Sequence, residues 1–176
     1  MHTSTAMTET QRRSDFQALF QRHRGIVFKV AHSYARHPED RADLVQEIAA
    51  QLWRSFPGFN PAHSFTTWMY RVALNVAISH VRTQALRRRH DGGSLEEAPR
   101  EIADTQTCEP GEHHAQQQQV ALLQRFIQRQ PPLERALLLL YLDERPQREI
   151  ASVLGLSETN VSTRIGRLKQ RLREAT

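Results

Sequence analysis

The chain has 176 residues, enough for one domain of ordinary size or two small ones. Hydrophobic residues make up 39% and charged residues 24%, which excludes a wholly disordered chain and a membrane protein. Residues 1–13 contain no apolar stretch typical of a secretion signal. The single cysteine, Cys108, excludes an internal disulfide and a cysteine-rich metal module. We therefore expect a cytoplasmic protein without membrane insertion.

The charge is unevenly distributed along the chain. Residues 1–90 carry 13 Arg/Lys against 6 Asp/Glu, and residues 115–176 carry 10 against 6. Residues 91–114 carry 1 against 7, so an acidic strip separates two basic blocks. Basic domains in a chain with a pI near 10.1 indicate a polyanionic partner, usually nucleic acid.

Apolar residues recur at helical spacing on both sides of the acidic strip, and β-branched alternation is absent. In chain order the pattern predicts these helices: 16–34, 38–56, 64–89, 120–127, 133–142, 147–154 and 158–174. Ser64 is a suitable N-cap for the third of them. That helix carries apolar residues around nearly its whole circumference, so either neighbouring helices or a partner must cover it.

Residues 91–114 contain two adjacent glycines and two prolines without sustained apolar periodicity. We interpret this segment as a flexible linker and residues 1–13 as a disordered tail. The predicted fold is all-α, with helical domains at 14–90 and 115–176.

Residues 147–161 have the spacing of a helix-turn-helix. Ala151 is small where the two helices cross, Gly155 permits the tight turn, and Ser157 can cap the second helix. Polar side chains at the start of that helix can reach base edges in the major groove, and the later cations can hold phosphates.

Three stretches in this order resemble the sigma-70 family of bacterial RNA polymerase sigma factors, in its extracytoplasmic-function (ECF) group. They are residues 43–47 with Trp53 and Phe56, residues 65–75, and the helix-turn-helix preceded by residues 131–135. The resemblance implies a sigma factor that directs promoter-specific transcription initiation. Its implied partners are core RNA polymerase, through the β′ coiled coil and the β flap, promoter DNA, and an anti-sigma factor.

The resemblance also implies three sets of binding residues. Those that contact the β′ coiled coil are Asp43, Gln46, Glu47, Gln51 and Arg54. Those that bind the melted −10 element as single strand are Phe59, Asn60, Trp68, Tyr70, Arg71, Asn75 and Arg82. Those that read the −35 duplex are Asn160, Ser162, Thr163, Arg164, Arg167, Lys169 and Arg171. Aromatic platforms and cations suit unstacked bases, although Trp68 can equally pack in the core.

Two other classes of protein remain as alternatives. A stand-alone helix-turn-helix regulator would bind duplex operators without polymerase, but residues 43–47 and 65–75 have no reason to occur together in a ligand-sensing domain. An enzyme is not expected, because the sequence contains no Gly-rich phosphate loop, HExxH, GxSxG or paired-cysteine motif. We accordingly predict no catalytic residue, no cofactor and no metal site.

Overall fold

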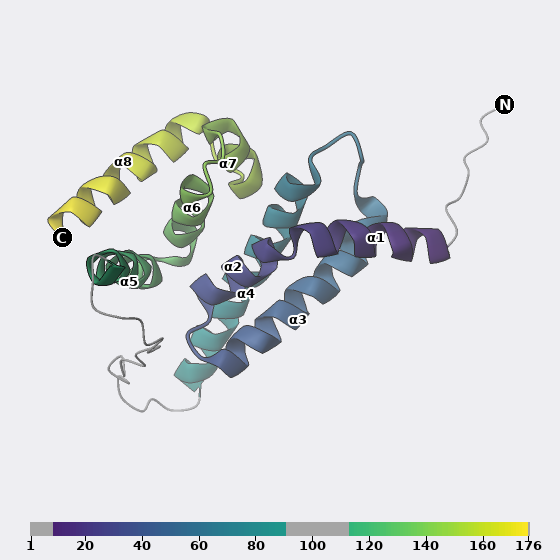
Figure 1. The fold of residues 1–176 in the computed structure, drawn as a ribbon, viewed down its shortest axis with the longest axis horizontal. Coiled ribbons are helices and arrows are strands. Elements are labelled where there is room, and N and C mark those ends of the chain that lie inside the picture. The colour runs from purple at the N-terminus through teal and green to yellow at the C-terminus, as the bar shows by residue number, and fades with distance from the viewer. Residues whose placement is uncertain (1–8, 91–112, 176) are drawn as a thin grey trace.

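The computed structural model describes residues 9–90 and 113–175. All regular elements in these two ranges are helices (Figure 1). In chain order they are α1 (Glu9–His23), α2 (Gly25–Tyr34), α3 (Pro38–Ser55), the 3-10 turn η1 (Phe56–Gly58), α4 (Phe65–His90), α5 (His113–Arg129), α6 (Pro132–Leu142), α7 (Gln147–Leu154) and α8 (Glu158–Glu174). The prediction of an all-α chain is confirmed. None of the described helices is long and apolar enough to cross a membrane.

The segment 16–34, expected as one helix, is divided into α1 and α2 at Arg24. The two parts face different neighbours, because Phe16 of α1 packs its ring against Trp53 and Phe56 while α2 lies against α3 and α4. Helix α1 already begins at Glu9, so residues 9–13 of the expected tail are helical. Arg12 forms an ion pair with Glu9 and lies over the Trp53 ring, 5.9 Å from its centroid, which favours this extra turn.

The core of the N-terminal half lies between α2, α3 and α4. Val27 of α2, Leu44 and Ile48 of α3, and Met69 of α4 have no exposed surface. Ser64 caps α4 as expected, since its Oγ accepts a hydrogen bond from the amide of Thr67 at 3.4 Å. Because α2, α3, α6 and α7 all contact α4, other helices of the same chain cover much of its apolar surface.

The helix-turn-helix is formed by α7 and α8, as the sequence predicts. Gly155 follows α7 in the left-handed region, with φ of 67°, and Ser157 Oγ accepts from the amide of Asn160 at 3.2 Å. A Cβ atom on Gly155 would meet no atom within 4 Å. The turn therefore needs glycine for its left-handed backbone conformation, and not because a side chain would clash. Ile150, Val161 and Leu168 bury the inner face of this pair of helices.

We expect Gly155→Ala to lower the free energy of unfolding by about 1–2 kcal/mol, because an L side chain is strained in the left-handed region. The matched control is Gly166→Ala in the middle of α8, where a Cβ atom also meets nothing within 4 Å. That change should stabilise the chain by about 0.5–1 kcal/mol. Urea unfolding followed by circular dichroism measures both, and equal effects of the two substitutions would contradict the assignment.

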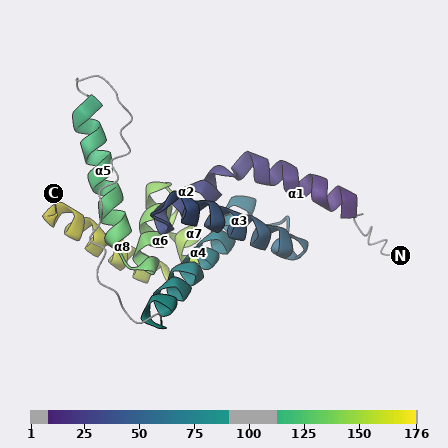
Figure 2. The ribbon, with the colours of Figure 1, turned by 90° about the horizontal axis from the view of Figure 1, so that it is seen from below.

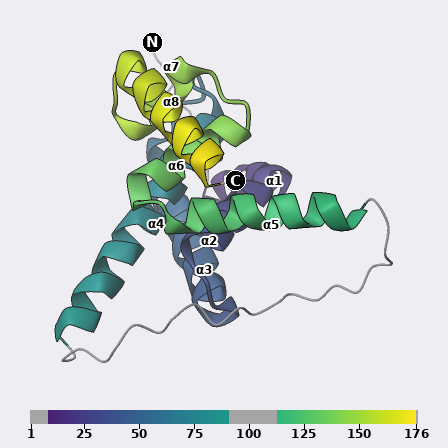
Figure 3. The ribbon, with the colours of Figure 1, turned by 90° about the vertical axis from the view of Figure 1, so that its left-hand side faces the viewer.

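The two halves of the chain pack against each other. Helices α6 and α7 contact α4, and α5 and α6 contact α2. Figure 2 shows α6, α7 and α8 gathered on one side of α4 while α1 extends from the other side, and Figure 3 shows the last turns of α4 projecting away from the rest. The last two residues of the expected linker, 113 and 114, belong to α5. The other linker residues lie outside the described ranges, as do residues 1–8 of the expected tail.

Candidate nucleic-acid interface

Helix α8 places most of the predicted −35 residues on one exposed face. At 100° per residue, five of the seven predicted side chains share this face: Asn160, Thr163, Arg164, Arg167 and Arg171. Val161, Ile165 and Leu168 lie on the buried face, which fixes the orientation of the helix. The cations on the shared face form a basic surface, on which the structure places a shallow pocket lined by Arg164, Arg167, Gln170, Arg171 and Glu134.

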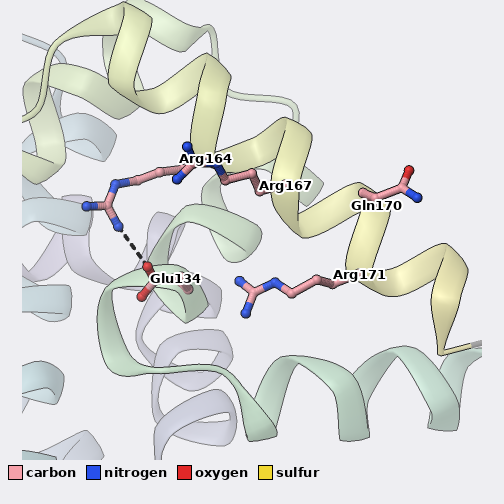
Figure 4. Close-up of a pocket in the computed structure, with 5 residues that line it drawn as sticks. All are labelled: Glu134, Arg164, Arg167, Gln170 and Arg171. Atoms are coloured by element: carbon pink, nitrogen blue, oxygen red, sulfur yellow. Dashed lines mark hydrogen bonds and ion pairs between the residues drawn. The ribbon is translucent and has the colours of Figure 1, made fainter.

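Arg164 is held by two groups of the protein itself, one of which, Glu134, is drawn in Figure 4. Its Nη1 donates to Glu134 Oε1 of α6 at 2.7 Å, and its Nε donates to Asn160 Oδ1 at 2.8 Å. Arg171 points toward the same side as Glu134, whereas Gln170 points away from it. Arg164 and Asn160 are therefore oriented before any ligand binds, while Arg167 and Arg171 are exposed.

The other two predicted −35 residues lie on a different flank of α8. Ser162 and Lys169 are separated by about half a turn from Arg167. Lys169 places its Nζ over the Tyr141 ring of α6, 4.5 Å from the ring centroid. The structure thus does not bring all seven predicted residues together.

The predicted −10 aromatic residues belong to a ring cluster at the start of α4. Phe59 and Trp68 are half-buried, with ring centroids 5.2 Å apart, and both also contact the rings of Phe56 and Phe65. Asn60 precedes this cluster, and its Oδ1 accepts from the amide of Ala62 at 2.9 Å. Each of the two predicted rings keeps only part of its surface open to solvent.

The four remaining predicted −10 residues on α4 differ in their exposure and contacts. Asn75, Arg82 and Arg71 are exposed. Tyr70 is fully buried, with its hydroxyl donating to Asp143 Oδ2 at 2.7 Å, so in this arrangement its ring offers no open face to a base. The reason is tertiary, because α6 and α7 lie against this side of α4.

The residues predicted to contact polymerase form a polar stripe along α3, which we call the α3 stripe (Asp43, Gln46, Glu47, Gln51 and Arg54). Leu44, Ile48 and Leu52 on the opposite side are completely buried. Arg54 donates to Gln51 Oε1 at 2.8 Å, and Glu47 Oε2 lies 3.1 Å from Nδ1 of His80 on α4. Except for the half-buried Gln51, the stripe is exposed.

A cluster of charged residues at the end of α6 has no counterpart in the predicted site. Asp143 accepts a hydrogen bond from Lys29 of α2, from the Tyr70 hydroxyl, and from Arg145 Nε at 3.2 Å. The Arg145 guanidinium also lies over the Tyr70 ring, 5.3 Å from its centroid. Since Lys29 and Asp143 are 114 positions apart, no local sequence signal predicts that they are in contact.

The surroundings of Asp143 set its ionisation. Partial burial raises the pKa of Asp143, but hydrogen bonds from Lys29, Tyr70 and Arg145 and the charge of Lys29 outweigh it and leave this pKa below its ordinary value. Desolvation and the hydrogen bond to Asp143 raise the pKa of Tyr70. Asp143 is therefore ionised at neutral pH, and its contribution to stability is lost only as the pH falls through its lowered pKa. Within the described ranges, no group of three or more His, Cys, Asp or Glu side chains could hold a metal ion.

Comparison with known proteins assigns both halves of the chain. Residues 19–87 match the family model for sigma-70 region 2, and residues 121–172 match the model for sigma-70 region 4. The chain is 30% identical over 168 residues to the RNA polymerase sigma factor CnrH of Cupriavidus metallidurans, covering 89% of this chain and 84% of CnrH. The chain belongs to the sigma-70 family. Its relatives place it in the ECF group of these sigma factors.

Two further comparisons describe the extent of this likeness. The chain is 26% identical over 159 residues to the ECF sigma factor SigE of Mycolicibacterium smegmatis. The matched region covers 89% of this chain but 59% of SigE. The fold is similar to that of the sigma factor RpoE of Bartonella quintana, solved in complex with the anti-sigma factor NepR. That structure has a TM-score of 0.71 at 17% identity, and covers 92% of this sigma factor and 96% of RpoE.

Proposed function

We propose that this sigma factor binds core RNA polymerase and directs promoter-specific transcription initiation by contacting both the −10 and the −35 promoter elements. The observation that carries the proposal is the presence of region 2 and region 4 in one chain, with region 2 first. Region 2 contains the α3 stripe and the α4 surface, and region 4 contains the basic face of α8. A stand-alone regulator needs only the last of these.

The C-terminal half reads the −35 duplex with α8 as the recognition helix. Asn160 and Thr163 lie in the N-terminal turns of α8, where side chains of a recognition helix reach base edges. Arg167 and Arg171 follow on the same face and contact phosphates, which carry most of the salt-dependent affinity. Arg164 is fixed by Glu134 and Asn160, so it approaches DNA with its guanidinium already oriented.

The N-terminal half binds the opened −10 strand along α4. Arg71, Asn75 and Arg82 lie within about 40° of one another around the helix and are exposed, which suits a backbone-tracking contact. Phe59 and Trp68 continue this surface toward the start of α4 and offer ring faces for unstacked bases. Asn60 lies in the loop before α4, next to the same rings.

The partners follow from the same family assignment. The α3 stripe binds the β′ coiled coil of core polymerase, the C-terminal half contacts the β flap, and an anti-sigma factor controls access to these surfaces. RpoE, with the similar fold, was solved with such a factor. The chain acts in the cytoplasm, and it contributes binding without catalysing a reaction itself.

Gel filtration with purified core polymerase tests this function directly. A sigma factor elutes with core, and the wild-type chain is expected to do so at physiological salt. If the chain elutes separately from core while still shifting duplex DNA in a gel, the proposal is contradicted and the stand-alone regulator replaces it.

A further inference from the structure

The carboxylate of Glu134 lies within the basic face of α8. Glu134 belongs to the first turn of α6, yet it lines the same pocket as Arg164, Arg167 and Arg171. Figure 4 shows it in contact with Arg164, with Arg171 pointing toward the same side. Within the described ranges, Arg164 is the α8 cation that forms an ion pair with a carboxylate. A negative charge at this place weakens phosphate binding, so electrostatic affinity for DNA does not explain it.

The ion pair both orients Arg164 and reduces its effective charge. Glu134 Oε1 accepts from Arg164 Nη1 at 2.7 Å, and Asn160 Oδ1 accepts from Arg164 Nε at 2.8 Å. The side chains of Arg164 and Glu134 are 34% and 19% exposed, so protein atoms shield much of the pair from water and salt. A guanidinium has more N–H groups than these two contacts use, and the remaining ones can donate to a base edge.

These contacts favour a base edge over a phosphate as the target of Arg164. To bind a phosphate, the guanidinium would have to leave Glu134, or the phosphate would have to approach a carboxylate of the same charge. A base edge is uncharged, and a guanidinium held in one orientation can distinguish the acceptors of one base pair from those of another. Arg167 and Arg171 are exposed and can contact phosphates without this constraint.

We propose that Glu134 is a positioning residue for sequence recognition, which holds Arg164 for a base edge of the −35 duplex and keeps it from binding phosphates of any sequence. The inference rests on the proposed function, because it takes α8 as the helix that reads duplex DNA. The cations of α8 then have two roles. Arg164 contributes to sequence preference, whereas Arg167 and Arg171 contribute to affinity for any duplex.

The test compares a selected duplex with a random one. The full-length parent chain selects duplexes from a pool of randomised sequence, and the most enriched sequence is synthesised as a short labelled duplex. Fluorescence anisotropy over a salt series measures the affinity of each variant for this duplex and for a labelled pool of random sequence. The ratio of the two affinities is the selectivity.

We expect Glu134→Gln to lower the selectivity at least about tenfold, because a neutral amide holds Arg164 less strongly than a carboxylate does. The same variant should bind the random pool about threefold more tightly, with a salt slope steeper by about one, since one more arginine meets phosphate. Glu158→Gln, in the first turn of α8, removes the same charge from an exposed residue away from the contact with Arg164. This control should keep the selectivity within about twofold of the parent.

Arg164→Ala tests whether Glu134 acts through Arg164. In that background, Glu134→Gln should lower the selectivity by no more than about a further twofold, because the group that it positions is absent. A further tenfold loss would overturn the inference.

The inference is also overturned if Glu134→Gln keeps the parent selectivity, or if it weakens binding to both duplexes equally, as loss of a purely structural contact would. The same holds if Glu158→Gln lowers the selectivity as much as Glu134→Gln does. Each of these results, obtained with a parent chain that enriches one sequence, leaves the proposed −35 reading intact. A parent chain that binds duplex DNA but enriches no sequence contradicts that reading and the inference together.

Discussion

Replacing Arg167 and Arg171 together by Ala is expected to weaken binding to a short DNA duplex about 100-fold, or about tenfold for each arginine. Both side chains are exposed on the face of α8 that also carries Asn160, and both line the pocket beside Glu134. The loss should be electrostatic, so the slope of log affinity against log salt should fall by about two. Fluorescence anisotropy over a salt series measures affinity and slope together.

Arg173→Ala is the control for this pair. Arg173 is exposed and carries the same charge on the same helix, but it lies well round the helix from Arg167 and Arg171. We expect its removal to change duplex affinity less than threefold. If Arg173→Ala weakens duplex binding as much as the double substitution does, the net charge and not the position on α8 determines the affinity.

The second large effect is expected on α3, where substitutions of two adjacent residues should change different properties, stability for one and polymerase binding for the other. Ile48 is completely buried, and Ile48→Ala should lower the free energy of unfolding by about 2–5 kcal/mol because it leaves a cavity in the core. Glu47, one residue before it, is exposed on the α3 stripe. Glu47→Arg should change stability by no more than about 0.5 kcal/mol yet weaken core polymerase binding at least tenfold, since a reversed charge opposes the partner's surface.

Urea unfolding and a core-binding titration measure these two variants side by side. Glu47 also contacts His80 on α4, so His80→Gln tests whether loss of that contact alone affects binding. We expect His80→Gln to bind core like the parent chain. Normal core binding by Glu47→Arg would remove the α3 stripe from the proposed polymerase interface.

The elements that the sequence predicts best have local signals at their ends. Pro38 marks the start of α3, Ser64 caps α4, and Gly155 with Ser157 divides α7 from α8. Each of these features acts within a few residues of its own position, so periodicity and capping preferences are sufficient to place it. The break at Arg24 has no such local signal, because the helical pattern continues through it while the packing partners change.

The arrangement of the site depends on contacts that local patterns do not contain. Trp68 and Arg71 were assigned to α4 correctly, but the burial of Tyr70 results from Asp143, 73 positions later. The orientation of Arg164 likewise results from Glu134, 30 positions earlier. Sequence spacing identifies which residues share a helix face. The packing of α6 and α7 on α4 determines which of these residues are exposed to solvent.

Run-off transcription from a genomic promoter library shows whether this chain directs initiation at promoters. Purified core polymerase is assayed at fixed salt with no addition, with the wild-type chain, and with the Arg167→Ala, Arg171→Ala double variant. We expect new transcripts with the wild-type chain whose start sites share −10 and −35 elements, and few or none with the variant. No new start sites with wild type, under conditions where core is active, would contradict promoter-directed initiation by this chain.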